Sequence, residues 1–415
     1  MNWGNMKASV IAAMCLVPIV VVAQEANDPA QGNFVDLSDS AVAPQSGDDG
    51  SSHVLSNAWW QNLDIYGFAA AGYYDTGTDG TRQYGGFEIK EATLFIETTV
   101  WENAAVFFEL QTNRLGKDDQ LFTRTGEVYL HFRDLPIGNN FAVGVKLGRI
   151  DIPFGEEYLW QDAVDNPLIT NSAAYPYGWD EGVLVYGNVG DWQWIAAITD
   201  GTDARSSEEN SDKALNLKVG RQIGVAHVSV SAMRNGDGTK SAIEFGGSHF
   251  QPVGASHGSS LGASPSTQVG ASLYQVDAKL DLDTAYSGYV AVAAGFADQS
   301  DSAPGFDRDF RWFSIEPMLR LTTKAYVIAR FSEIGTQDSL AGYHFDGKTF
   351  AGGNSTFGYD VKSFRRLAIG LGWQPNPRVV AKLEVGRDRF DLIAASTVPN
   401  PGRRNFVGFE VAASF

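Results

Sequence analysis

Apolar and polar residues alternate along most of the chain. In one stretch Leu94 and Ile96 fall on one side of the alternation, while Glu97 and Thr99 fall on the other. The same period of two recurs in 127–133. A period of two indicates β-strands whose two faces meet unlike environments. Alternation therefore predicts an all-β protein, but it does not by itself choose between a soluble sandwich and a membrane barrel.

The lengths of the connections make that choice. The pattern predicts sixteen strands, and the segments that follow them are alternately long and short. The predicted strands are 61–74, 86–100, 104–113, 124–134, 140–150, 181–189, 191–200, 213–222, 224–234, 268–283, 285–297, 310–321, 325–335, 361–374, 378–391 and 403–415. Long extracellular loops and short periplasmic turns are typical of a transmembrane antiparallel β-barrel. We expect about 16 strands, with fourteen or eighteen as alternatives.

The last predicted strand alternates up to a terminal aromatic residue. Val407, Phe409, Val411, Ala413 and Phe415 share one face. Such an ending resembles the assembly signal of bacterial outer-membrane proteins, which implies recognition of Phe415 by the barrel-assembly machinery. An ordinary soluble strand that ends in phenylalanine is the alternative.

Tryptophans are expected in an aromatic girdle at the membrane surface. Five of them lie near predicted strand ends or on predicted outward faces: Trp101, Trp192, Trp194, Trp312 and Trp373. Buried tryptophans would give a similar sequence pattern.

The N-terminal part of the chain differs from the rest. Residues 1–23 contain one lysine followed by an unbroken apolar stretch, which predicts a secretory signal peptide. Residues 24–57 are rich in Ser, Asp, Gly and Asn and predict a flexible, acidic periplasmic leader. The barrel would then occupy 58–415. Cys15 is the only cysteine, so disulfides and thiolate metal sites are excluded.

Composition limits the partners. The 49 acids and 31 bases give a formal net charge of −18, which argues against binding of nucleic acid. No stretch approaches the ~18 apolar residues of a membrane helix, so strands must do the spanning. The predicted surroundings are outer-membrane lipid, in the cell outer membrane of a Gram-negative-type bacterium.

Three short motifs resemble the phosphate-selective porin O and P family. They are Gly148–Glu157 with its Pro-Phe-Gly and acid, Gly182–Gly187, and Arg365–Trp373 followed by Asn376-Pro377 and the strand that contains Lys382-Leu383-Glu384. The resemblance implies a sixteen-stranded porin, a homotrimer, and a third loop folded inward as a constriction. It does not by itself imply phosphate as the solute.

The third predicted loop, 151–180, is long enough to cross a barrel of this size. Phosphate-selective members of the family bring arginines to this constriction, yet no Lys or Arg occurs between Arg149 and Arg205. The candidate constriction residues are Asp151, Glu156, Glu157, Asp162, Asp165, Asp180 and Glu181. Rings of carboxylates favour cations. Alternatively, any one of these acids faces bulk water or caps a turn.

The predicted inner wall is nearly balanced in charge. The bases assigned to the lumen are Arg133, Lys146, Lys218, Lys279, Arg320, Arg330, Arg366 and Lys382. The acids are Glu97, Glu109, Glu127, Asp277, Glu316, Glu384 and Glu410. Residues of this kind form cross-strand pairs that stiffen a wall. An anion-binding ladder of arginines is the sharper alternative.

Other chemistry is faint. His249 and His257 lack the spacing and third ligand of a zinc site. Four further acids lack the spacing of a calcium loop: Asp298, Asp301, Asp307 and Asp309. No hydrolase, metalloprotease or phosphate-loop motif occurs, and sequence pairs no serine or acid with His131 or His227. We therefore expect no enzyme, no cofactor and no metal.

The function that the sequence favours is passive diffusion of small hydrophilic solutes through a water-filled porin, with an acidic third loop that prefers cations or neutral solutes. Three alternatives stay open: an anion-selective, phosphate-type porin that uses the wall bases, a structural barrel that sheathes a redox partner, and a soluble secreted β-protein.

Overall fold

The computed structural model describes only part of the chain. The described residues are 62–75, 85–114, 121–137, 142–173, 176–201, 212–238, 244–245, 248–249, 269–282, 287–301, 308–336, 343–345, 359–392 and 403–415. The predicted signal peptide, the leader and residues 58–61 lie outside them. Among the described residues, no helix has the length and apolar character needed to cross a bilayer.

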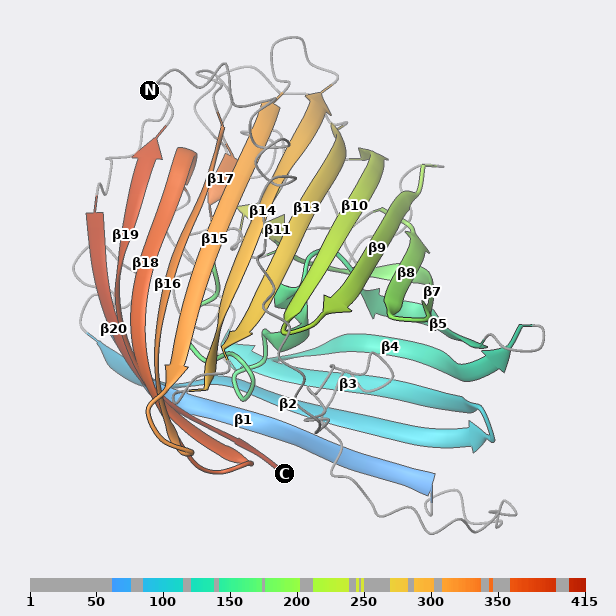
Figure 1. Ribbon diagram of the computed structural model, residues 1–415, viewed down its shortest axis with the longest axis horizontal. Helices are drawn as coiled ribbons and strands as arrows, with labels where there is room; N and C mark the ends of the chain where they lie inside the picture. The colour runs from blue at the N-terminus through green and yellow to red at the C-terminus, as the bar shows by residue number, and fades with distance from the viewer. Residues whose placement is uncertain are drawn as a thin grey trace. The chain divides into compact units, whose positions relative to one another are not determined.

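Sixteen long strands in the described residues form one sheet (Figure 1). They are β1 (Leu63–Asp75), β2 (Gly86–Trp101), β3 (Ala104–Arg114), β4 (Leu121–Pro136), β5 (Ala142–Asp151), β7 (Trp179–Val189), β8 (Trp192–Thr199), β9 (Ala214–Ile223), β10 (Ala226–Gly238), β13 (Val269–Leu282), β14 (Gly288–Asp301), β15 (Arg308–Arg320), β16 (Ala325–Thr336), β18 (Tyr359–Asn376), β19 (Val379–Leu392) and β20 (Arg403–Ser414). Each pairs antiparallel with the next, which confirms the predicted architecture and strand count.

The last strand closes the barrel against the first. β20 pairs with β1 from Phe68 opposite Ser414 to Asp75 opposite Val407. Beyond this ladder, the Phe415 N–H donates to the Gly67 carbonyl at 2.9 Å. Closure leaves the sixteen described barrel strands without an unpaired edge, which is the condition for β-structure to be stable in lipid.

In the described parts of the long connections lie five short elements: η3 (Glu157–Trp160), β6 (Pro176–Tyr177), β11 (Glu244–Phe245), β12 (Ser248–His249) and β17 (Tyr343–Phe345). The four short strands form a ladder, β6–β11–β12–β17, that ends on β18. These strands leave no sign in the sequence, because two or three residues are too few to show a period.

Polar residues of the barrel point inward and apolar residues point outward. On β20 the buried positions include Arg404 and Glu410, while Val407, Phe409 and Val411 are exposed. The same arrangement holds on β19, where Lys382 and Glu384 are each 1 % exposed and Leu383 is 45 % exposed. An apolar exterior around a charged interior is the reverse of a soluble sandwich.

The tryptophans agree with the predicted girdle in part. Trp101, Trp192 and Trp373 are well exposed at the short-turn end of their strands, and alternation places Trp194 outward beside Trp192. The prediction for Trp312 was wrong. It is buried in the lumen, on the same face of β15 as Glu316 and Arg320, so the inward assignment of those two residues already placed it inside.

Candidate functional site

The loop between β5 and β7, hereafter loop 3, is described at residues 152–173 and 176–178, and these residues enter the barrel and pack against its inner wall (Figure 1). The Ile152 N–H donates to the Gly178 carbonyl at 2.9 Å, which closes the base of the loop. Phe154 then joins an apolar cluster inside the barrel, with its ring centroid 6.4 Å from that of Trp312. Gly155 follows at φ 74°, a conformation that favours glycine.

The first limb of loop 3 is fixed to β9 and β10. Glu156 forms an ion pair with Lys218 at 3.0 Å and contacts His227 Nε2 at 3.2 Å. The Gly155 N–H donates to Ser231 Oγ at 3.0 Å. Burial alone would raise the pKa of Glu156, but the Lys218 ammonium and the His227 hydrogen bond lower it to about 2. This contact therefore stays ionic at neutral pH.

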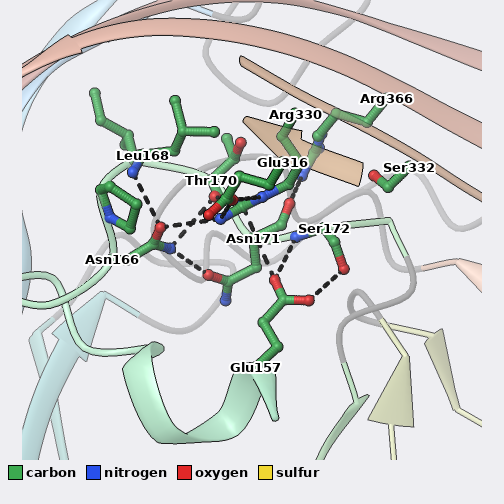
Figure 2. A network of polar contacts seen from close by, with 12 residues as sticks. Glu157, Asn166, Leu168, Thr170, Asn171, Ser172, Glu316, Arg330, Ser332 and Arg366 are labelled. Carbon is green, nitrogen blue, oxygen red and sulfur yellow. Dashed lines mark hydrogen bonds and ion pairs between the residues drawn. The ribbon is translucent and has the colours of Figure 1, made fainter. Parts of the chain in front are cut away.

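The middle of loop 3 is held together by its own side chains. Glu157 accepts hydrogen bonds from the Ser172 N–H at 2.8 Å and from Ser172 Oγ at 2.6 Å (Figure 2). Asn166 donates to Asn171 Oδ1 at 2.6 Å and accepts from the Leu168 N–H at 3.0 Å. Burial raises the pKa of Glu157, against the opposing effect of Arg330.

Two wall arginines hold the backbone of the second limb (Figure 2). Arg330 on β16 donates to the Thr170 carbonyl at 2.6 Å and is also hydrogen-bonded to Glu316. Arg366 on β18 donates to the Asn171 carbonyl at 3.1 Å. Both guanidinium groups therefore donate their hydrogen bonds to loop 3 and to neighbouring carboxylates.

A lysine and a glutamate on β19 complete this attachment. Lys382 Nζ donates to the Ala163 carbonyl at 2.7 Å and lies 2.6 Å from Glu410 Oε1. Glu384 accepts from the Thr170 N–H at 2.9 Å and from Thr170 Oγ1 at 2.5 Å. The Glu384 carboxylate thus binds a backbone N–H group of the loop, and the Lys382 ammonium binds a backbone carbonyl group.

The bases of this wall, and Lys218 on β9, have little surface left for a solute. Five of them, from β9, β16, β18, β19 and β20, are 5 % exposed or less: Lys218, Arg330, Arg366, Lys382 and Arg404. Arg366 and Arg404 share Asp388, at 2.9 Å and 3.2 Å. A donor already bound to a carbonyl or carboxylate cannot replace the hydration shell of a passing anion.

The wall from β2 to β5, which is joined to the β16–β20 wall through β1, presents a row of carboxylates. The Glu127 N–H donates to Glu109 Oε2 at 2.9 Å, and the Asp151 N–H donates to Glu127 Oε1 at 2.9 Å. A Cβ at Gly126 would come 2.2 Å from the Glu109 carboxylate, so this glycine permits the close approach. The row therefore depends on the backbone of β4 as well as on its charges.

Loop 3 adds its own carboxylates to this row. Asp162 is half-buried and Asp165 is exposed. Burial raises the pKa of Asp162 well above its usual range, and neighbouring carboxylates raise it further. The acids that act on it are Glu91, Glu109, Asp165 and Glu127. We call Glu91, Glu109, Glu127, Asp151, Asp162 and Asp165 together the acidic face.

Two predicted constriction residues lie in β7 rather than in loop 3. Asp180 is fully buried and accepts from the Gly201 N–H at 2.6 Å. Glu181 pairs with Arg149 at 2.8 Å, and alternation from the inward Leu184 places it on the outer face.

The remaining predicted wall residues fall into small contacts. Arg133 pairs with Glu97 at 2.6 Å, and Lys146 lies over the Tyr129 ring at 4.4 Å. Lys279 lies 4.7 Å from the ring centre of Tyr289. Arg320 and Asp277 are half-buried and buried, respectively. These contacts do not bring the predicted bases into one ladder.

Sequence reasoning missed several lumenal residues, among them Lys90 and Arg124. Lys90 Nζ donates to the Ile169 carbonyl at 2.8 Å and lies 3.2 Å from Glu410. A register shift in the β1–β2 ladder near Ala70 interrupts the simple alternation of β2. A bulge of this kind leaves no clear mark in the sequence.

The histidines on the inner wall serve as hydrogen-bond partners. His131 Nε2 lies 2.8 Å from Tyr186 Oη, and His227 contacts Glu156. In the part of the chain that the structure describes, no three His, Cys, Asp or Glu residues are placed to hold a metal ion. Two of the candidate ligands, His257 and Asp307, lie outside that part.

No family model and no curated protein matches the chain. Solved structures do match over most of its length. The outer membrane channel DcaP of Acinetobacter baumannii is 12 % identical at a TM-score of 0.57, covering 85 % of this chain and 97 % of its own. This chain has the fold of that outer membrane channel.

Two further structures have the same fold. The trimer form of OmpT, an outer membrane protein of Vibrio cholerae, is 11 % identical with a TM-score of 0.54, and the match covers 85 % of this chain and 99 % of that one. An anion-selective porin from Comamonas acidovorans is 10 % identical with a TM-score of 0.52, over 85 % and 99 % of the two chains. Because an anion-selective protein shares this fold, the barrel alone does not decide ion selectivity.

Proposed function

We propose that the protein is an outer-membrane porin that lets small hydrophilic solutes diffuse passively through its lumen and prefers cations or neutral solutes. One observation carries the proposal: a loop of the barrel is fixed across the lumen by the bases of one wall, which leaves carboxylates on the other. The loop narrows the passage, and the negative charge of the acidic face makes the passage prefer cations.

The exterior supports a membrane location. Outward side chains of β18 to β20 are large and apolar yet 36–56 % exposed, among them Ile369, Trp373 and Phe409. An apolar surface of this kind on a closed barrel is stable in lipid and unstable in water. This argues against a soluble secreted β-protein.

The distribution of lumenal charge supports cation preference. Carboxylates near an ion path lower the energy of a cation and raise that of an anion. Asp162 and Asp165 lie on the loop itself; Glu109 and Glu127 act electrostatically on Asp162, and Lys382 acts on Asp165. Arg124 lies among them, but its guanidinium donates to Gln111 and stacks 4.3 Å from the ring centre of Trp179.

A phosphate-selective porin and a sheath around a redox partner are less well supported. A phosphate-selective porin needs bases that can bind a passing anion, and those of the β16–β20 wall are bound to loop 3 or, for Arg404, to Asp388. A sheath needs a lumen open to a folded chain, whereas the described loop crosses from the β9–β10 wall to the β16–β19 wall.

Four further parts of the proposal rest on the sequence. They are a signal peptide at 1–23, an acidic leader at 24–57, recognition of Phe415 by the assembly machinery, and a homotrimer. The exposed Phe415 at the barrel seam is compatible with such recognition.

Planar-bilayer recording of the purified, folded protein tests the proposal. We expect ohmic conductance and, across a potassium chloride gradient, a reversal potential of the sign that cation preference gives. Absence of conductance from folded protein would overturn the channel. Anion preference would overturn the assigned role of the acidic face but leave the channel standing.

A further inference from the structure

The outer face of the barrel carries arginines near the long-loop ends of β18, β19 and β20. Arg365, Arg389 and Arg403 lie directly opposite one another across these three strands. Arg387 lies one outward position closer to the short turns, opposite Asn405. A chain neighbour of each arginine is buried in the lumen, so alternation directs all four outward. We call them the outer arginine cluster.

Two carboxylates lie beside this cluster and neutralise only part of it. Arg365 Nε donates to Glu333 Oε1 at 2.8 Å. Arg389 lies 3.7 Å from Asp391, which is beyond hydrogen-bond distance, and Asp391 instead accepts from Ser363 Oγ at 2.8 Å. The Arg389 side chain is 48 % exposed.

The other two arginines have no carboxylate partner among the described residues. Arg387 Nε donates to the neutral amide oxygen of Asn405 at 2.7 Å. Arg403 is exposed. Four guanidinium groups thus face two carboxylates, and like charges directly opposite each other on neighbouring strands are destabilising. The arrangement is favourable only where something else supplies negative charge.

The depth of the cluster points to what supplies it. On the short-turn side of the arginines, the outward residues of the same strands are apolar: Ile369, Leu371, Leu383, Val385, Val407 and Phe409. The span from Trp373 to Arg365 is eight residues, or about 26 Å along the strand and about 20 Å along the barrel axis at a tilt of ~40°. The apolar band of a membrane barrel is about 25 Å tall. The arginines therefore lie where that band ends.

We propose that the outer arginine cluster binds the phosphorylated headgroup of an anionic lipid in the leaflet on the long-loop side. This inference rests on the proposed membrane location. A guanidinium group presents paired N–H donors that match phosphate oxygens, and three adjacent strands spaced about 4.8 Å apart present a surface about 10 Å wide. The acyl chains would lie along the apolar rows below the arginines.

An ion pair elsewhere on the outer face provides the matched contrast. Arg149 on β5 donates to Glu181 on β7 through two guanidinium nitrogens, at 3.0 Å and 2.8 Å. This arginine is neutralised by the barrel itself, so it has no charge left for a lipid. Arg149→Gln is therefore the control for any change in the cluster.

The test compares native protein, R389Q/R403Q and R149Q. The full chain in neutral detergent is titrated with phosphatidic acid, phosphatidylcholine or inorganic phosphate, and bound lipid is counted by native mass spectrometry. We expect native protein and R149Q to bind phosphatidic acid in preference to phosphatidylcholine. We expect R389Q/R403Q to bind it about tenfold more weakly or worse, because charge-assisted hydrogen bonds are lost. Without anionic lipid, the double variant should unfold at the same temperature as native protein or higher, since arginine repulsion is relieved.

Three outcomes would overturn the inference. Native protein could show no preference for phosphatidic acid, or R389Q/R403Q could bind phosphatidic acid as well as native protein does. Inorganic phosphate could also raise the unfolding temperature of native protein as much as phosphatidic acid does, which would indicate an anion site without a lipid. Bilayer conductance of R389Q/R403Q should match native protein, since neither residue faces the lumen. A native protein that binds phosphatidic acid but conducts no ions would remove the channel and leave the lipid site in place.

Discussion

The two sides of the lumen use their charged residues in different ways. On the wall from β16 to β20, Arg330 and Lys382 are buried and bind backbone carbonyls of loop 3. On the wall from β2 to β5, Glu109 and Glu127 accept backbone N–H groups of the wall, and the acids of loop 3 lie near them. Both sets are buried, at 2 % and 1 % for Arg330 and Lys382 and at 6 % and 7 % for Glu109 and Glu127, so the two walls differ in what they bind: the first binds loop 3, and the second binds its own backbone.

This difference teaches that a near balance of wall charges says little about selectivity. Eight bases and seven acids are assigned to the lumen from sequence, yet the bases bound to loop 3 are electrically occupied. The field along the passage is set by the groups that keep contact with water. In this barrel, residues far apart in the chain decide which groups those are.

The largest expected effect follows from removing an attachment. Lys382→Met deletes the ammonium that binds the Ala163 carbonyl and leaves Glu410 with Lys90 as its remaining ion-pair partner. We expect a loss of about 3 kcal/mol, since the variant leaves a buried charge less well paired, and a larger, noisier conductance as loop 3 detaches. Thermal unfolding and bilayer recording measure these effects.

Lys324→Met, at an exposed position in the β15–β16 turn, is the control and should change neither quantity. Native stability and conductance in Lys382→Met would show that the second limb of the loop does not depend on this wall.

A smaller effect is expected from Glu384→Gln, which replaces an acid on the wall from β16 to β20. The change weakens the charge-assisted bonds from Thr170, with an expected cost of about 1–3 kcal/mol. The reversal potential should stay as in native protein, because Glu384 is buried under the loop. A large loss of cation preference in this variant would show that the acids of both walls act alike on the permeating ion.

The loop acids should change selectivity without changing stability. Asp162→Asn with Asp165→Asn removes two charges from the acidic face. A unit charge about 5 Å from an ion in water is worth about 0.8 kcal/mol, or roughly a fourfold change for the cation and an opposite fourfold change for the anion, so the cation-to-anion ratio changes by roughly sixteenfold for each charge. Reversal potentials in a salt gradient measure this ratio. Glu181→Gln, on the outer face, is the matched control and should leave the ratio unaltered.

The pH dependence should separate the two sides as well. Because the pKa of Asp162 is raised, its carboxyl takes up a proton while the pH is still above the usual carboxylate range, and cation preference should fade there as the pH falls. The pKa of Glu156 is lowered to about 2, so its contact with Lys218 is lost only as the pH falls toward that value. Between these limits, selectivity should change while conductance noise from the loop does not. Simultaneous loss of both would contradict the assignment.

Sequence predicted the barrel well because each strand meets water on one side and an apolar exterior on the other, and this difference produces an alternation of polar and apolar residues along the strand. It could not predict which inward bases hold loop 3. The contact of Arg330 with Thr170 joins residues 160 positions apart, and no local pattern records it. Lys90 was missed because alternation fails where the β1–β2 ladder slips, whereas Trp312 lies on the inward face that alternation gives β15.

The role of the acidic face is tested most directly by the reversal potential of the native protein in a potassium chloride gradient at neutral pH, repeated at falling pH. The predicted result is cation preference at neutral pH that declines as the acidic face is protonated. Anion preference at neutral pH would contradict that role, because the bases of the wall from β16 to β20 would then be acting on the permeating ion.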